Sequence, residues 1–168
     1  MKGNICVIGL VKSYTKNIAK KVSDKLDMFF GDLDELMEFD LIDLNNVKNI
    51  CGQEYVDKVE QSKMKMLVSF ENTLSTFNYS LLNNKNNLNN IKSKSIIIFI
   101  KLNKVNAKNK LIRAGVKKDD LNLQLDLLNE RNKLCEKYAD IVVDANDLSI
   151  NKVISNIKEQ LLNFMLKE

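Results

Sequence analysis

The 168-residue sequence predicts an α/β fold in which helices cover both faces of a five-stranded parallel sheet, a three-layer αβα arrangement. Short apolar runs alternate with segments of helical periodicity along the whole chain. The run at residues 96–100, Ile-Ile-Ile-Phe-Ile, is continuous and rich in β-branched side chains, as in a strand covered on both faces. No internal repeat or change of composition marks a second domain, so residues 1–168 are expected to form one domain.

Five apolar runs supply the predicted strands. They lie at residues 5–8, 28–30, 66–70, 94–102 and 139–143. The first run ends at Gly9, and the second leads into an Asp-Leu-Asp sequence formed by Asp32 and Asp34 around a leucine. Because helical segments separate the runs, the strands are expected to be parallel.

Apolar residues spaced by three or four positions predict helices at residues 15–26, 53–63, 121–137 and 150–166. The Asp-Leu-Ser sequence at residues 147–149 is expected to cap the last of them. The side chains expected to face the core are Ile18, Ala19, Val22, Leu26, Tyr55, Val56, Val59, Leu121, Leu125, Leu128, Val153, Ile157, Leu161 and Phe164.

Two polar stretches are predicted to be connections rather than packed elements. Residues 81–94 are rich in Asn and Lys, which indicates a helix end that leads into a solvated loop. Residues 103–120 are polar and contain Gly115, which indicates a mobile, lid-like segment.

Composition excludes several function classes. There is no histidine, so histidine-dependent triads and His-ligated zinc sites are ruled out. The net charge is +4, but only Arg113 and Arg131 are arginines and the lysines are scattered, which argues against nucleic-acid binding. No apolar run approaches the 18 or more residues of a membrane span, and the apolar stretch near the N-terminus is too short for a signal peptide.

The three cysteines, Cys6, Cys51 and Cys135, are odd in number and far apart, which predicts neither a disulfide framework nor a metal site. A structural thiol is expected at Cys51. A reducing cytoplasm is the expected location.

The segment after the first strand has the strand–loop–helix context of a phosphate-binding P-loop, G-x-x-x-x-G-K-[ST]. Counted from Gly9, the second glycine, the lysine and the hydroxyl would fall at residues 14, 15 and 16. The chain has Tyr14, Thr15 and Lys16 there instead. The motif is therefore degenerate at the residues that bind phosphate and Mg²⁺.

Several segments together resemble the shikimate kinases, small P-loop kinases that phosphorylate a cyclic hydroxy acid with ATP. The Ile-Gly-Leu around Gly9 and the Gly-Asp-Leu-Asp after Phe30 fit the family in order and spacing. So do the Gly-Gln-Glu-Tyr-Val-Asp segment from Gly52 and the Glu-Arg helix around Arg131, which runs into Ala-Asp and the last strand. The resemblance covers nearly the whole chain and implies a P-loop fold of the nucleoside-monophosphate-kinase type.

The resemblance also assigns site residues on the acceptor side. It implies that Asp32 serves the metal and the nucleophile and that Asp34 and Arg131 contact the substrate. The family's second carboxylate-binding arginine is replaced by Asp57, and the family's glycine-rich substrate loop is absent. Asp32 and Asp34 are equally consistent with a polar strand end that only retains its ancestry.

On the phosphate side, the resemblance implies contacts from Gly9, Lys12, Ser13, Thr15 and Lys16. For the lid arginine, the chain offers Arg113 or the lysines at positions 108, 110, 117 and 118. Lys16 lies where the metal-binding hydroxyl belongs, so we expect it to stand in for the metal and to allow weak binding of phosphate, ATP or ADP without Mg²⁺. No metal-ligating residue is assigned. Both lysines are also consistent with solvated surface charges.

Three functions remain open. The first is a catalytically impaired shikimate-kinase-like protein that acts as a binding or regulatory module, with a small anionic ligand or a protein as its partner. The second is an active ATP-dependent kinase, a transferase that phosphorylates a hydroxyl group through a reworked loop. The third is a structural or assembly role.

Arg131 is expected to pair with Asp57 or Asp34 and so to fill the substrate site.

Overall fold

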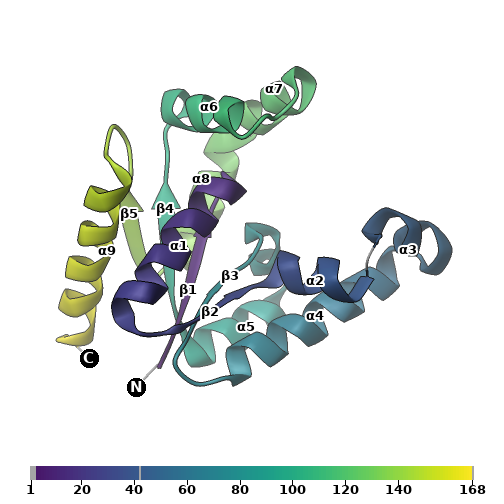
Figure 1. Ribbon diagram of the computed structural model, residues 1–168, viewed down its shortest axis with the longest axis horizontal. Helices are drawn as coiled ribbons and strands as arrows, with labels where there is room; N and C mark the ends of the chain where they lie inside the picture. Colours follow the sequence, from purple (N-terminus) through teal and green to yellow (C-terminus); the bar gives the residue numbers. More distant parts are fainter. Residues whose placement is uncertain (1–2, 42, 168) are drawn as a thin grey trace.

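The computed structural model describes residues 3–41 and 43–167. Its core is a parallel sheet in the order β2-β3-β1-β4-β5 (Figure 1). The strands are β1 (Asn4–Gly9), β2 (Phe29–Asp32), β3 (Thr73–Thr76), β4 (Ser95–Lys101) and β5 (Ile141–Asp144). The predicted five-stranded parallel sheet is therefore confirmed.

Helices lie on both faces of this sheet, as predicted. The helices are α1 (Lys12–Leu26), α2 (Leu33–Leu41), α3 (Leu44–Cys51), α4 (Gln53–Ser69), α5 (Lys85–Lys94), α6 (Lys104–Arg113), α7 (Lys118–Asp126), α8 (Leu128–Tyr138) and α9 (Ile150–Met165), with a 3-10 helix η1 at Tyr79–Asn83. One apolar core joins α1, α9, α6 and α7 to the sheet, and a second joins α2, α4 and α5 to the opposite face. In Figure 1, α6 and α7 lie beyond one end of the sheet, and α3 extends away from it.

The ends of the chain fold as the sequence predicts. Ile18, Ala19 and Val22 of α1 are fully buried, and α9 buries Val153, Ile154, Ile157 and Leu161. Ser149 caps α9, because its side chain accepts a hydrogen bond of 3.3 Å from the backbone N–H of Lys152.

The third strand lies elsewhere than predicted. Residues 66–70 contain the last turn of α4 and the residue after it, whereas β3 begins at Thr73. Three of the four residues of β3 carry hydroxyl groups, which hides the strand from a search for apolar runs. They are nevertheless buried, and the hydroxyl of Ser75 lies 3.4 Å from the carbonyl oxygen of Ile5 on the neighbouring strand. Tyr55, expected to face the core, is 47% exposed.

The two polar connections are wrong as predictions of irregular structure. Residues 81–94 form the end of η1 and the whole of α5, which Asn84 caps by accepting hydrogen bonds from the backbone N–H groups of Asn86 and Asn87. Residues 103–120 contain α6, a turn at Gly115 with a φ of +76°, and the start of α7.

The helices around this second stretch also differ from the prediction in their bounds. Ala107 and Leu111 anchor α6 in the core. The predicted helix at 121–137 is two helices, which meet at Leu127. The helices α2 and α3 were not predicted from the sequence.

None of the described helices has the length and apolar character needed to cross a membrane.

Candidate functional site

The candidate site lies where β1, β2 and β3 end and α1 begins. Gly9 closes β1, and any side chain at this position would meet Thr15, because an added Cβ would lie 2.1 Å from the Thr15 hydroxyl oxygen. That hydroxyl donates a 3.0 Å hydrogen bond to the backbone oxygen of Val11. Thr15 is 3% exposed, so its side chain supports the loop from within. A cavity of about 60 Å³ remains between the loop, Asp32, Asp34 and the end of β3.

Lys16 points from α1 towards two carboxylates. Its Nζ lies 2.5 Å from Oε1 of Glu35 and 3.5 Å from Oδ2 of Asp32. The Asp32 side chain is only 2% exposed, and its other oxygen accepts a 3.0 Å hydrogen bond from the backbone N–H of Glu35. Asp32 therefore has two contacts, one as the cap of α2 and one with the ammonium of Lys16. The hydrogen bond to Glu35 raises the pKa of Lys16, so this side chain remains a cation.

A second ion pair lies beside the first. Nζ of Lys12 is 2.8 Å from Oδ2 of Asp34, and the lysine side chain is 62% exposed. Both lysines of the loop are thus paired with the two aspartates that the sequence singles out.

Tyr14, at the position of the second loop glycine, is 9% exposed and belongs to the core beneath α6. Nζ of Lys110 lies 4.1 Å from the centre of its ring, a cation–π contact. The tyrosine hydroxyl is buried without a hydrogen-bond partner. Burial, and then the charge of Arg113, lower the pKa of Lys110. The ring of Tyr14 is therefore packed against α6.

Arg131 does not make the ion pair that the sequence predicted. Its guanidinium lies over the ring of Tyr79, 5.4 Å from the centre. Asp57 instead accepts a 2.6 Å hydrogen bond from the side chain of Gln53, and Asp34 is bonded to Lys12.

A larger open cavity, of about 630 Å³, brings several of the predicted residues together. Lys12, Ser13, Lys16 and Arg131 line it, alongside side chains of α6 and α7. Arg113, a candidate for the lid arginine, lies exposed at the end of α6 and is not among the residues that line this cavity.

Glu60, the last residue of the family-like segment that begins at Gly52, interacts with Asp34 and Asp57, although the sequence analysis assigned it no role. Burial raises the pKa of its carboxyl group, and the charges of Asp34 and Asp57 raise it further. The spacing from Asp57 to Glu60, three residues on a helix, was the available signal. The acceptor side of the site is therefore rich in carboxylates. No group of three or more His, Cys, Asp or Glu within the described ranges is arranged to hold a metal ion.

A parallel sheet in this order, with the loop after β1 opening into α1, defines the class of P-loop kinase folds. The model of the family described as "SKI: Shikimate kinase" matches residues 15–162, and the chain belongs to this family.

Similar proteins agree with this assignment. Curated relatives named shikimate kinase are 27% identical in Buchnera aphidicola subsp. Baizongia pistaciae, over 97% of this chain and 98% of that protein, and 24% identical in Vibrio parahaemolyticus, over 95% and 96%. Among solved structures, the shikimate kinase of Bacteroides thetaiotaomicron superposes with a TM-score of 0.80 at 18% identity, covering 94% of this chain and 97% of the other. The shikimate kinase of Acinetobacter baumannii in complex with shikimate gives 0.79 at 15%, covering 96% and 93%.

Proposed function

We propose that this member of the shikimate kinase family is a binding or regulatory module that takes up a small anionic ligand without Mg²⁺ and is impaired in phosphoryl transfer. The observation that carries the proposal is the contact of the Lys16 ammonium with Asp32 and Glu35, at 3.5 and 2.5 Å. The family resemblance places the metal at this position, and here the chain supplies its own cation.

The residues around Asp32 do not fit a divalent cation. Two unit charges 4 Å apart repel by about 4 kcal/mol at an effective dielectric constant of 20, and Mg²⁺ carries two charges. The hydrogen bond that raises the pKa of Lys16 keeps this side chain protonated at neutral pH. Thr15, in place of the family's lysine, has a buried hydroxyl bonded to Val11 and offers a ligand neither a charge nor a free donor.

The cavity lined by Lys12, Ser13, Lys16 and Arg131 suits an anion in both charge and size. Its volume of about 630 Å³ lies within the range of roughly 300–1,000 Å³ for small-molecule sites. Phosphate, or the phosphates of ADP or ATP, would bind here by sharing the loop lysines with Asp32 and Asp34. Carboxylate substrates are disfavoured, because Asp57 and Glu60 lie on the acceptor side.

One observation favours the second candidate, an active ATP-dependent kinase of hydroxyl groups. Asp32 remains at the end of β2 and Asp34 in the first turn of α2, each close to a lysine that a bound phosphate could also contact. In such an enzyme Asp32 would accept the proton of the substrate hydroxyl. The Asp32→Asn variant would then abolish ATP turnover.

Thermal unfolding with ATP, ADP or inorganic phosphate, each in Mg²⁺ or in EDTA, separates these functions. A ligand present at a hundred times its dissociation constant adds about 2.7 kcal/mol to the free energy of unfolding. We expect a rise in Tm in EDTA that Mg²⁺ does not increase, without turnover of ATP. A rise in Tm that requires Mg²⁺, or turnover that Asp32→Asn abolishes, would instead establish the kinase.

The matched pair Lys16→Ser and Lys20→Ser tests the residue itself, because both lysines lie on α1 and Lys20 is exposed. Lys16→Ser is expected to lose the shift in EDTA, and Lys20→Ser to keep it. Equal shifts in both variants would contradict a binding role for Lys16.

A further inference from the structure

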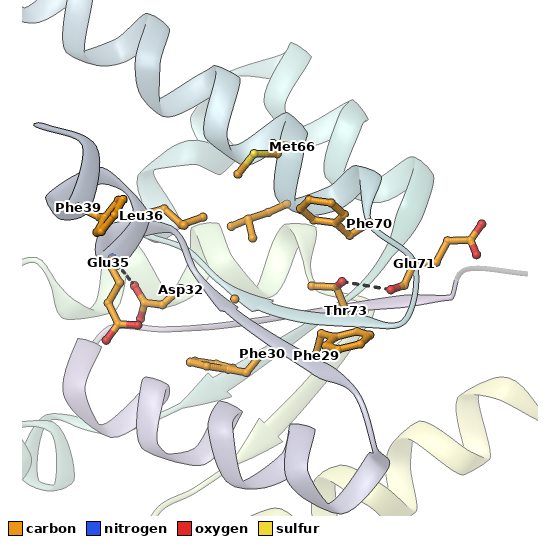
Figure 2. A pocket seen from close by; sticks show the side chains of 12 residues that line it. Phe29, Phe30, Asp32, Glu35, Leu36, Phe39, Met66, Phe70, Glu71 and Thr73 are labelled. Carbon is orange, nitrogen blue, oxygen red and sulfur yellow. Dashed lines mark hydrogen bonds between the residues drawn. The ribbon is translucent and has the colours of Figure 1, made fainter.

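The outer edge of β2 borders an apolar groove that is distinct from the anion cavity, although its lining includes Asp32 and Glu35, the two carboxylates bonded to Lys16. β2 is one of the two edge strands of the sheet and, within residues 3–41 and 43–167, pairs only with β3. The groove has a volume of about 670 Å³ and lies between β2, α2 and the end of α4 (Figure 2). Its apolar side chains are Phe29, Phe30, Leu36, Phe39, Met66, Leu67 and Phe70.

These aromatic rings are exposed to an unusual degree. Phe29 is 74% exposed, Phe39 is 83% exposed and Phe70 is 54% exposed. A single exposed apolar side chain needs no explanation, but several that surround one groove are typical of an interaction surface. Because β3 occupies one side of β2 only, every second residue of β2 directs its backbone N–H and C=O away from the sheet.

The groove is free of basic side chains although the chain is rich in them. Lys and Arg make up 26 of the 168 residues, yet none of the described residues that line the groove is either of them. Lysine on an edge strand is a common protection against pairing with another chain. The shortness of β2 limits such pairing, but the strand carries no lysine.

Charge at the groove selects among possible occupants. Asp32, Glu35 and Glu71 line it, and Lys16 is bonded to the first two. Three carboxylates with one ammonium leave the groove acidic. A second copy paired with β2 about a two-fold axis would bring six carboxylates together with two ammonium groups, which disfavours self-association.

We propose that the β2 groove docks an extended, basic and apolar segment of another protein. The segment would lie alongside β2 as an added strand and take up its free backbone groups. Its alternate apolar side chains would cover Phe29, Phe39 and Phe70, and its Lys or Arg side chains would face Glu35 and Glu71. The site differs from the anion cavity in position, in polarity and in the sign of its charge.

The test is a bead library of octapeptides in which Val, Ile or Phe alternates with Lys, Ser or Glu, probed with the dye-labelled full-length protein. Beads that retain the protein are expected to be rich in Lys, and a selected peptide is expected to bind about tenfold more tightly than its Glu counterpart, or by about 1.4 kcal/mol. Failure to select any bead, or selection of Glu-rich beads, would overturn the proposal.

Two variants locate the binding. The double variant Phe29→Ser, Phe39→Ser removes exposed rings only and is expected to lose the selected peptide. The control Val105→Ser, Leu162→Ser changes side chains that are 67% and 59% exposed on α6 and α9, and it is expected to keep it. Equal loss in both, or in neither, would place the peptide elsewhere.

Two further results decide the mode of binding. The selected peptide is remade with N-methyl groups at its odd or at its even positions, and only one of the two sets is expected to abolish binding, because only one edge of the peptide faces β2. Binding by both methylated peptides would exclude strand addition. A dimer in sedimentation that Phe29→Ser dissociates would assign the groove to a second copy and overturn the proposal.

Discussion

The two sides of the candidate site balance their charges differently. On the loop side, Lys12 and Lys16 lie opposite Asp34, Asp32 and Glu35, so each charge is close to one of opposite sign. On the acceptor side, Asp57 and Glu60 raise the local negative charge, and Arg131 lies over a tyrosine ring instead of an acid.

This difference indicates how each side departed from the family pattern. On the loop side, the ammonium of Lys16 contacts Asp32 and Glu35, so under the proposed function the charge of Lys16 takes the place of that of a metal. On the acceptor side, Asp57 stands where the family pattern has an arginine, and the lost positive charge is not compensated there. Substitutions on the loop side should therefore cost stability, and substitutions that remove acids on the acceptor side should gain it.

Tyr14→Ala should have the largest effect on the loop side. Removing a buried aromatic ring costs about 3–5 kcal/mol, and the space beneath α6 would be left empty. Tyr14→Phe keeps the ring and removes the hydroxyl that lacks a partner, so it should be neutral or stabilising by up to about 1 kcal/mol. Urea unfolding measures both variants. If Tyr14→Ala lowered the free energy of unfolding no more than an ordinary surface substitution does, the ring would not be packed in the core.

Lys16→Ser should cost about 2–3 kcal/mol, because Asp32 keeps its buried charge and loses its partner. Added Mg²⁺ should restore part of this loss in the variant and have no such effect on the original protein. Unfolding of Lys20→Ser under the same conditions gives the cost of removing a solvated lysine from α1. Equal losses of stability in Lys16→Ser and Lys20→Ser would show that Lys16 does not compensate the buried charge of Asp32.

On the acceptor side, Asp57→Arg should improve the binding of a carboxylate ligand, whereas the loop substitutions lower stability. It removes one of the charges that raise the pKa of Glu60 and restores the cation that the family resemblance places there. Affinity for shikimate, measured by calorimetry, should rise about tenfold, or by about 1.4 kcal/mol. The control Lys58→Arg changes the residue next to Asp57 in α4 without changing its charge. A rise that matches the control would argue that the position does not face a carboxylate.

Glu60→Gln should have the smallest effect and a clear dependence on pH. The pKa of Glu60 is raised by burial, so the folded protein binds this proton more tightly than the unfolded chain does. The charged form therefore destabilises the fold at neutral pH. The variant should melt above the original protein at pH 7, and the gain should vanish below the carboxyl's unfolded pKa of about 4.3, where both states are protonated. A gain of equal size at low pH would point to packing.

Local sequence was enough to predict the elements whose burial is carried by apolar side chains. The run at 96–100 and the apolar stripe of α9 identify their elements directly, since one is buried on both faces and the other on one. β3 could not be found this way, because three of its four buried residues carry hydroxyl groups, and the partner of the Ser75 hydroxyl, the carbonyl of Ile5, is supplied by the neighbouring strand. α6 was missed because only Ala107 and Leu111 are buried, while its other apolar side chains, Val105 and Ile112, are exposed and obscure the apolar stripe.

The site could be predicted as a set of residues but not as a set of contacts. Lys16 and Asp32 were named from motif positions, and the structure places them 3.5 Å apart. The assignment of Asp32 as metal ligand or proton acceptor stays a prediction. Arg131 was assigned to the wrong partner, because a sequence does not say whether an arginine will meet an acid or an aromatic ring. Glu60 was overlooked because its altered pKa depends on burial within the fold.

The distribution of the cysteines has a practical consequence. Burial raises the pKa of Cys6 well above its usual value and that of Cys135 to about 12, so neither buried thiol will react readily with a maleimide. Cys51 is exposed at the end of α3, next to Gly52, whose φ of +82° marks the bend into α4. The natural sequence thus carries a single addressable thiol at a joint between two helices. A fluorophore attached there would report movement of α3 without any engineering of the chain.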